Sequence, residues 1–172
     1  MTAIEPQTIR TDRLTLLPLR VEHADEMAAA LADAQLHTFI GGSPATVEAL
    51  RARYERLVAG SPDADVSWCN WVVQLHDEDG DCLTGTVQAT VTAGDGAVAA
   101  EIAWVVGTPW QRRGIASEAA RGLVAWLAKQ HVRTVVAHIH PDHAASAAVA
   151  TAAGLAPTEH WHDGEVRWEG TA

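Results

Sequence analysis

Residues 98–140 read VAAEIAWVVGTPWQRRGIASEAARGLVAWLAKQHVRTVVAHIH. The stretch begins with a β-rich run at 98–106 and ends with another at 134–140, and from 114 to about 130 the apolar residues recur at helical spacing. A strand, a helix and a second strand in this order form a βαβ unit, whose two strands are parallel neighbours in one sheet. We therefore expect one parallel strand pair, with a splayed cleft between its strands.

The segments outside this unit predict an α/β fold with a mixed, mostly antiparallel sheet. Before it, three β-rich runs separated by glycine-containing turns predict an antiparallel meander. The expected order is βααβββαβαββ: a strand at 14–19, helices at 21–31 and from the capping Thr46 to Gly60, strands at 67–75, 83–92 and 98–106, a helix at 114–130, a strand at 134–140, a helix at 143–153, and a hairpin around Asp163-Gly164.

Length and charge narrow the class of protein. A chain of 172 residues has the size of one domain, and no linker or repeat interrupts it, so we expect a single domain over residues 1–172. Twelve Lys and Arg stand against 22 Asp and Glu, which gives a formal charge of -10. An acidic chain repels a phosphate backbone, so we expect no nucleic-acid partner.

The sequence also predicts where the protein works. No apolar run approaches the roughly 18 residues that span a bilayer, and the N-terminus lacks the apolar segment of a secretory signal. Two cysteines, Cys69 and Cys82, are too few for a disulfide framework, which fits a reducing compartment. We therefore expect a soluble, cytoplasmic protein with no membrane partner.

The sharpest local feature is Gln111-Arg112-Arg113-Gly114-Ile115-Ala116, which joins the run 98–106 to the following helix. A helix N-terminus presents unpaired backbone N–H groups and the positive end of the helix dipole. The small residues Gly114 and Ala116 let an anion approach the backbone, and two arginines add positive charge. The hexapeptide predicts a diphosphate site. The competing interpretation is an ordinary glycine-containing turn with two solvated arginines.

This hexapeptide also carries a resemblance. The chain resembles the GNAT superfamily of acyl-CoA-dependent N-acyltransferases, whose [QR]xxGx[GA] motif corresponds to residues 111–116. IRTDRLTLLPLR (9–20) and PDHAASAAVATAAGL (141–155) are similar to the branch that includes N-terminal acetyltransferases of ribosomal proteins. The resemblance implies the GNAT fold, with acetyl-CoA as co-substrate. It also implies that the backbone of 111–116 binds the CoA pyrophosphate and that Trp104, Val105 and Val106 pair with pantetheine as a neighbouring strand would.

Glu101 is the candidate catalytic base. It is the only acidic residue in the run 98–106, and members of the family commonly carry a catalytic carboxylate at this distance before the motif. An amine must lose a proton before it attacks a thioester, and a carboxylate whose pKa is raised by burial can accept that proton directly or through water. The competing interpretation is a structural glutamate that bonds neighbouring strand backbone.

Two further candidates, His143 and Ser146, lie at the start of the last long helix. The family pattern has Asn where this chain has His143; a neutral histidine divides the donor and acceptor roles of an amide between two ring nitrogens, so His143 either contacts CoA or simply begins the helix. Many relatives use a tyrosine to protonate the departing thiolate, but the only tyrosine, Tyr54, falls on an apolar helix stripe and is expected in the core. Ser146 is therefore the better candidate to contact the thioester sulfur.

A metal site is the main rival constellation. The sequence contains HxHxxH at 138–143 and a second HxH at 160–162, and residues two apart on a strand share a face. Imidazoles suit zinc, but no cysteine lies near them in the sequence. We expect no metal.

The sequence favours an N-acetyltransferase that moves acetyl from acetyl-CoA to a primary amine by direct attack. The alternative is a non-catalytic CoA-binding regulatory or sensor protein. A peptide α-amine, a polyamine and an aminoglycoside all stay open as acceptors. An α-amine, with a pKa of about 7.7 to 8.0 against about 10.4 for lysine, needs only a modest base, which favours peptide α-amines or small amines. The loops 35–45 and 162–165 are expected to select the acceptor. The oligomeric state stays open, with a homodimer among the alternatives.

Overall fold

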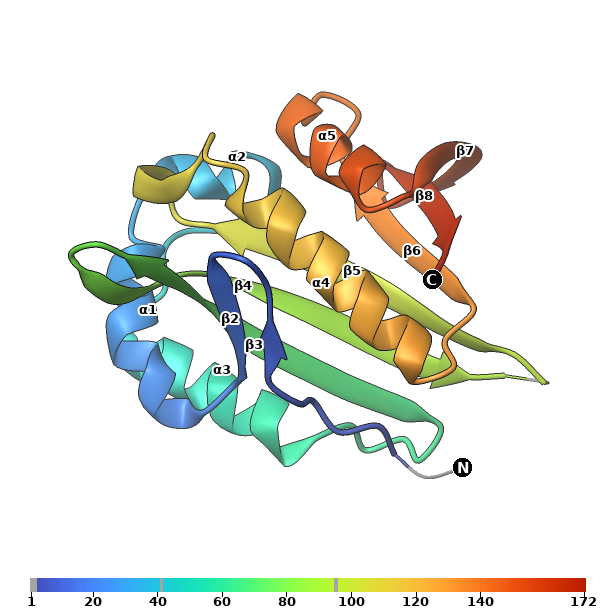
Figure 1. The fold of residues 1–172 in the computed structure, drawn as a ribbon, viewed down its shortest axis with the longest axis horizontal. Helices are drawn as coiled ribbons and strands as arrows, with labels where there is room; N and C mark the ends of the chain where they lie inside the picture. The colour runs from blue at the N-terminus through green and yellow to red at the C-terminus, as the bar shows by residue number, and fades with distance from the viewer. Residues whose placement is uncertain (1–2, 41, 95) are drawn as a thin grey trace.

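One mixed sheet organises the molecule (Figure 1). The computed structural model describes residues 3–40, 42–94 and 96–172. Within these residues the sheet has eight strands in the order β1-β2-β3-β4-β5-β6-β8-β7. The strands are β1 (Ile9–Arg10), β2 (Leu14–Pro18), β3 (Val66–Asp77), β4 (Gly80–Ala93), β5 (Val98–Val106), β6 (Thr134–Ile139), β7 (Ala156–His162) and β8 (Glu165–Thr171).

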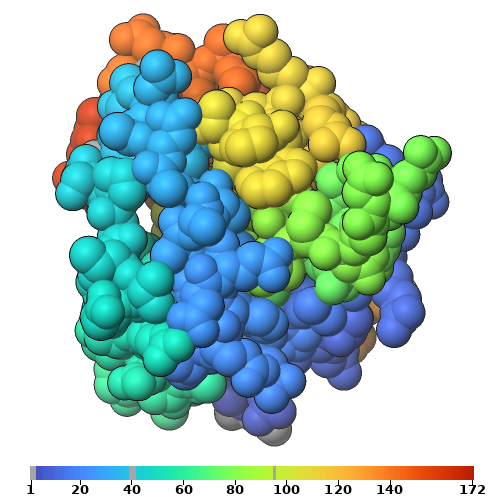
Figure 2. Space-filling model, turned by 90° about the vertical axis from the view of Figure 1, so that its left-hand side faces the viewer, coloured from blue at the N-terminus to red at the C-terminus, as the bar shows by residue number. Residues whose placement is uncertain are grey.

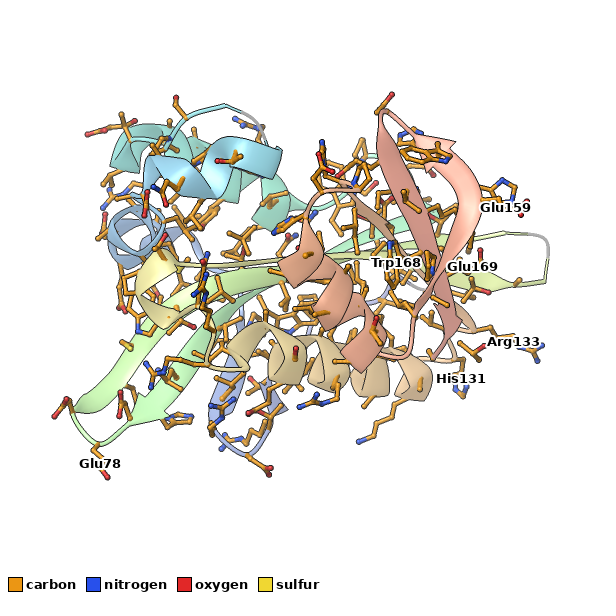
Figure 3. The ribbon with its side chains drawn as sticks, turned by 90° about the horizontal axis from the view of Figure 1, so that it is seen from above. Glu78, His131, Arg133, Glu159, Trp168 and Glu169 are labelled. Atoms are coloured by element: carbon orange, nitrogen blue, oxygen red, sulfur yellow. The ribbon has the colours of Figure 1, made fainter. Side chains whose placement is uncertain are left out.

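Helices cover both faces of this sheet. Seen from above, α4 and α5 lie on one side of the sheet and α1, α2 and α3 on the other (Figure 3). The helices are α1 (Ala24–Ala30), α2 (His37–Ile40), α3 (Val47–Ala59), α4 (Ile115–Lys129) and α5 (Ala144–Ala152), with short 3-10 turns η1 (Val21–His23), η2 (Ala34–Leu36) and η3 (Thr108–Trp110).

The expected architecture is confirmed. β3, β4 and β5 form the antiparallel meander, and β5 pairs with β6 in parallel. Thr46 caps α3 as predicted, because its Oγ1 accepts a hydrogen bond from the Ala49 N–H at 3.1 Å. Part of the turn expected at 94–96, residue 95, lies outside the described residues, as does residue 41 of the loop 35–45.

Three local details differ from the expectation. The helix expected over 21–31 is divided into η1 and α1, and it ends at Ala30 because Leu31 leaves the helical region (φ -106, ψ 22). The strand β1 was not predicted, since two residues are too few to show an alternating pattern. The four-residue α2 is too short for a helical repeat to appear.

The core occupies both faces of the sheet. On the face of α4, Leu123 belongs to one buried cluster with Ile102 of β5. On the other face, Met27 of α1 and Leu50 of α3 form a second cluster with Val72 of β3. Burying one such side chain contributes about 1.5 to 3 kcal/mol, so these apolar stripes fix the helices on the sheet.

The sheet forks between β5 and β6. Their parallel register covers only three pairs and ends at Glu101, which lies opposite Val136. Beyond that point β6 continues in antiparallel pairing with β8, through His138 opposite Arg167 and Ile139 opposite Val166. The two strands therefore diverge over the second half of β5, and the edge of β5 is open there.

Candidate active site

The open edge of β5 presents backbone hydrogen-bonding groups. The Val98 carbonyl accepts from the Arg133 N–H at 3.0 Å, on the side of β6. The backbone N–H and C=O groups of every second residue in a strand point to the same edge. Those of Trp104 and Val106 therefore point to the same edge as those of Val98, beyond the last pair between β5 and β6. The Gln111 side chain already donates to the Val106 carbonyl at 3.0 Å. The backbone N–H and C=O of Trp104 and the N–H of Val106 are therefore placed to form hydrogen bonds with an extended ligand.

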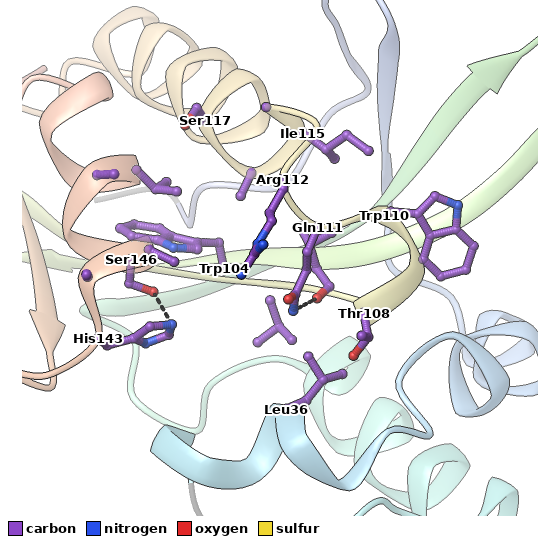
Figure 4. A pocket seen from close by; sticks show the side chains of 18 of the residues that line it. Leu36, Trp104, Thr108, Trp110, Gln111, Arg112, Ile115, Ser117, His143 and Ser146 are labelled. Carbon is purple, nitrogen blue, oxygen red and sulfur yellow. Dashed lines mark hydrogen bonds between the residues drawn. The ribbon is translucent and has the colours of Figure 1, made fainter.

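A cavity of about 580 Å³ lies along this edge (Figure 4). Ser146 and His143 stand on one wall, and Thr108 and Gln111 on the opposite wall. The cavity includes nearly all the predicted cofactor-binding residues: Trp104, Val105, Val106, Gln111, Arg112, Gly114, Ile115, Ala116 and His143. It also includes Gln35 and Leu36 of the loop 35–45, which the sequence associated with the acceptor.

The hexapeptide 111–116 forms a turn into α4 with two left-handed residues. Arg112 has φ 64 and Gly114, at the N-cap, has φ 75. No described side chain caps this N-terminus, so its first N–H groups face the cavity end without a side-chain acceptor. Together with the helix dipole and Arg112, they make this end of the cavity favourable for an anion.

An arginine from the other end of the chain braces this turn. The Arg13 Nη1 donates to the Arg113 carbonyl at 2.8 Å, and its Nε pairs with Glu118 Oε1 at 2.7 Å. Burial alone would raise the pKa of Glu118, but hydrogen bonds from Thr11 and from Arg13 outweigh burial and lower it. Arg113 is not among the residues that line the cavity, and its Nη2 lies 3.8 Å from Asp77 Oδ2. No local sequence pattern indicates the contact of Arg13 with Glu118, which joins residues 105 positions apart.

Ser146 and His143 form a polar pair in the cavity wall. The Ser146 Oγ lies 3.4 Å from His143 Nε2. Burial, together with the charge of nearby His140, lowers the pKa of His143, so the ring is neutral at neutral pH and keeps one donor and one acceptor. His143 is the N-cap of α5, but its side chain makes no capping hydrogen bond. Both candidates line the cavity.

Glu101 lies at the vertex of the fork rather than in the cavity lining. Its side chain is 55% exposed, which differs from the buried base that the sequence suggested. It projects to the face of α1 and α3, since it alternates with Ile102, which is buried on the α4 face. Glu101 Oε1 lies 2.7 Å from His138 Nδ1. The carboxylate thus stands where β5 and β6 part.

A second cavity, of about 160 Å³, opens on the face of α1 and α3. Leu36 and Val105 line both cavities, so the two meet at the edge of β5. Figure 2 shows the light-blue residues of η2 and α2 beside the yellow residues of η3 and the orange residues of α5. Hydrogen bonds from the Gln35 backbone and from Thr108 lower the pKa of Asp33, and they tie this loop to η3.

Tyr54 was expected in the core, and it is only 4% exposed. It also lines the second cavity, so it lies closer to the fork than the sequence indicated. Burial raises the pKa of Tyr54 to about 12. Its hydroxyl therefore stays protonated at neutral pH.

The rival metal site finds no support in the geometry. Within residues 3–40, 42–94 and 96–172, no group of three His, Cys, Asp or Glu side chains is arranged to hold a metal ion. His138 is bonded to Glu101 instead. Cys69 and Cys82 are free thiols, and burial raises the pKa of Cys69 to about 12. In the same part of the chain, no helix is long and apolar enough to cross a bilayer.

The chain matches one family model, and its fold is similar to that of solved structures. Residues 13–156 match the family model described as acetyltransferase (GNAT) domain. No curated protein matches the chain. Among solved structures, RimJ from Mycobacterium smegmatis in complex with CoA-disulfide has a TM-score of 0.76 at 19% identity, over 97% of this chain and 88% of that one.

Two further structures are similar at the level of fold. An acetyltransferase of the GNAT family from Bacillus anthracis has a TM-score of 0.72 at 20% identity, over 96% of each chain. AAC(6')-Ib in complex with parmomycin and acetyl-CoA has a TM-score of 0.73 at 18% identity, over 93% of this chain and 94% of that one. At such identities the likeness shows the shared fold alone.

Proposed function

The chain belongs to the acetyltransferase (GNAT) domain family, and we propose that it moves an acetyl group from acetyl-CoA to a primary amine by direct attack. One observation carries the proposal: a single cavity joins the uncapped N-terminus of α4 to the open edge of β5. Its two ends suit the two halves of CoA, an anionic diphosphate and an extended arm with amides. Solved structures of the same fold hold CoA-disulfide or acetyl-CoA.

In the proposed complex, the N–H groups of 111–116 and the guanidinium of Arg112 bind the pyrophosphate. The backbone of Trp104 and the Val106 N–H pair with the pantetheine arm as an added strand. An arm that follows β5 toward its N-terminal half ends at the fork, near Glu101. His143 and Ser146 contact it from the opposite wall.

The chemistry then needs no covalent enzyme intermediate. The ammonium group of the acceptor gives one proton to Glu101, directly or through water, and the amine lone pair attacks the thioester carbonyl. The new C–N bond forms, the C–S bond breaks, and the electron pair leaves with sulfur as the thiolate of CoA. Ser146 or a water then donates a hydrogen bond to that thiolate, and the amide nitrogen loses its remaining extra proton to solvent.

The second cavity is the proposed acceptor pocket. The charge of its lining side chains restricts the class of amine that it can accept. Its described lining includes Arg53 and the neutral polar side chains of Asn70, Thr86 and Gln88, but no carboxylate. A polycation such as a polyamine or an aminoglycoside needs several acidic partners. The lining therefore favours a peptide α-amine or a small amine, whose single charge Glu101 can meet.

The test is a panel of amines assayed for CoA release: peptides with free N-termini, small amines, a polyamine and an aminoglycoside. We expect release with a peptide or small amine and little with the polycations. Glu101→Gln should keep acetyl-CoA affinity and lower kcat by about 10²-fold, with a deficit that shrinks as the pH rises and the amine deprotonates unaided.

Glu78→Gln is the matched control, because Glu78 lies at the β3–β4 turn, far from the fork (Figure 3). It should leave kcat unchanged. A protein that binds acetyl-CoA but releases no CoA with any amine would instead support the non-catalytic CoA-binding alternative.

A further inference from the structure

His138 and Glu101 bridge the fork at its vertex. Glu101 is the last residue of β5 that pairs with β6, and His138 lies two residues beyond its partner Val136. The Nδ1 of His138 is 2.7 Å from Oε1 of Glu101. The His138 side chain is only 15% exposed, whereas that of Glu101 is 55% exposed. A largely buried histidine therefore contacts an exposed carboxylate at the point where the strands separate.

The partner decides which nitrogen of His138 carries the proton. An ionised carboxylate can only accept a hydrogen bond, so Nδ1–H donates to Glu101 Oε1. One carboxylate oxygen is occupied in this way, and Oε2 is left for the acceptor amine. The His138 ring also lies near the His162 ring, with centroids 5.1 Å apart and an interplanar angle of 45°.

We propose that His138 is a positioning residue, which holds the carboxylate of Glu101 in one orientation, aimed at the acceptor amine. The inference rests on the proposed function. An exposed glutamate samples many rotamers, and a hydrogen bond across the fork selects one of them. A stabilising role explains the pair poorly, because a polar contact with an exposed carboxylate contributes little to folding.

Other charged or titratable groups lie near the pair. From β8, Arg167 lies opposite His138 and Glu169 lies opposite Val136. His162 of β7 faces the His138 ring, and His140 follows two residues after His138. On the side of β4, the residue opposite Glu101 is the uncharged Thr90.

The first test is kinetic and uses two variants. His138→Ala should lower kcat by about ten- to hundredfold at unchanged affinity for acetyl-CoA, because the carboxylate loses its orientation. His138→Asn keeps a donor near the position of Nδ1 and should restore most of the rate.

His131→Asn is the matched control, because His131 lies in the turn after α4, away from both cavities, and Asn tolerates its positive φ of 65. It should leave kcat and the affinity for acetyl-CoA unchanged. Equal losses of kcat in the Ala and Asn variants, together with a lower Tm, would overturn the positioning role and leave His138 as a structural residue.

A second readout does not depend on turnover. The ¹⁵N NMR spectrum of the wild-type protein at neutral pH should show His138 with a proton on Nδ1, and Glu101→Ala should abolish that preference. An Nε2–H tautomer in the wild type would overturn the pair. If no amine is acetylated but Nδ1 carries the proton, the proposed acetyl transfer fails while the interaction that orients Glu101 stands.

Discussion

Gly114 shows how one residue can serve a ligand through its conformation and its size. It has φ 75, and a Cβ at this position would lie 3.4 Å from Arg13 Nη2. A branched side chain is strained there by about 1 to 2 kcal/mol and would occupy the space proposed for the pyrophosphate. We expect Gly114→Val to lose acetyl-CoA binding in calorimetry while the protein stays folded.

Gly96→Val is the control that distinguishes backbone strain from the loss of space for a ligand. Gly96 has φ 80, and its Cβ would meet no described atom within 4 Å. Gly96→Val should therefore show the conformational strain as a similar loss of stability, yet bind acetyl-CoA like the wild type. Unchanged affinity in a folded Gly114→Val protein would mean that this turn does not hold the pyrophosphate.

Ser146 and Tyr54 rank differently at the leaving group. Ser146 lines the larger cavity, whereas Tyr54 lines the second one. A thiol with a pKa of about 8.5 leaves readily near neutral pH, so an acid matters less than the base. We expect Ser146→Ala to lower kcat by roughly tenfold, about 1.4 kcal/mol, and Tyr54→Phe to leave kcat almost unchanged.

The opposite order of effects for Ser146→Ala and Tyr54→Phe would contradict this assignment. If Tyr54→Phe abolished turnover at unchanged stability while Ser146→Ala had no effect, the leaving thiolate would lie on the α3 side of β5. The proposed path of pantetheine past Ser146 would then be wrong.

At the scale of elements, the segment before β2 supports the turn before α4. Arg13 makes one hydrogen bond to the Arg113 carbonyl and one ion pair with Glu118. Because its side chain is 44% exposed, we expect Arg13→Ala to cost only about 1 kcal/mol of stability. The larger effect should be on acetyl-CoA, with a Kd raised about tenfold, because the turn loses its brace.

Arg10 provides the comparison, since it is an exposed arginine of the neighbouring strand β1. Arg10→Ala removes the same charge and should leave the Kd unchanged in the same titration. An equal loss in both variants would show that net charge, and not the brace, attracts acetyl-CoA.

The elements were predictable to different degrees, for physical reasons. The strand 98–106 and the motif 111–116 carry local signals, so their places follow from the sequence alone. The contact of Arg13 with Glu118 joins residues 105 positions apart, and no local pattern encodes it. His138 shows the same limit: its spacing suggested a metal ligand, but the parallel register places it against Glu101.

For the whole molecule, acetyl-CoA should act as a folding ligand. A ligand at 100 times its Kd stabilises the native state by about 2.7 kcal/mol. For a domain of this size that corresponds to a Tm raised by roughly 5 to 10 °C. We expect this rise in differential scanning fluorimetry with the wild type and no rise with Gly114→Val. A rise of equal size in that variant would place the stabilising site elsewhere.

The two cavities that meet at Leu36 and Val105 also constrain the kinetic order. In the proposed arrangement, donor and acceptor lie in different cavities, so neither has to leave before the other arrives, and both occupy the protein when the bond is exchanged. Initial rates measured at several fixed concentrations of one substrate should then give intersecting, not parallel, double-reciprocal lines. An unreactive analogue of the donor should compete with the donor alone.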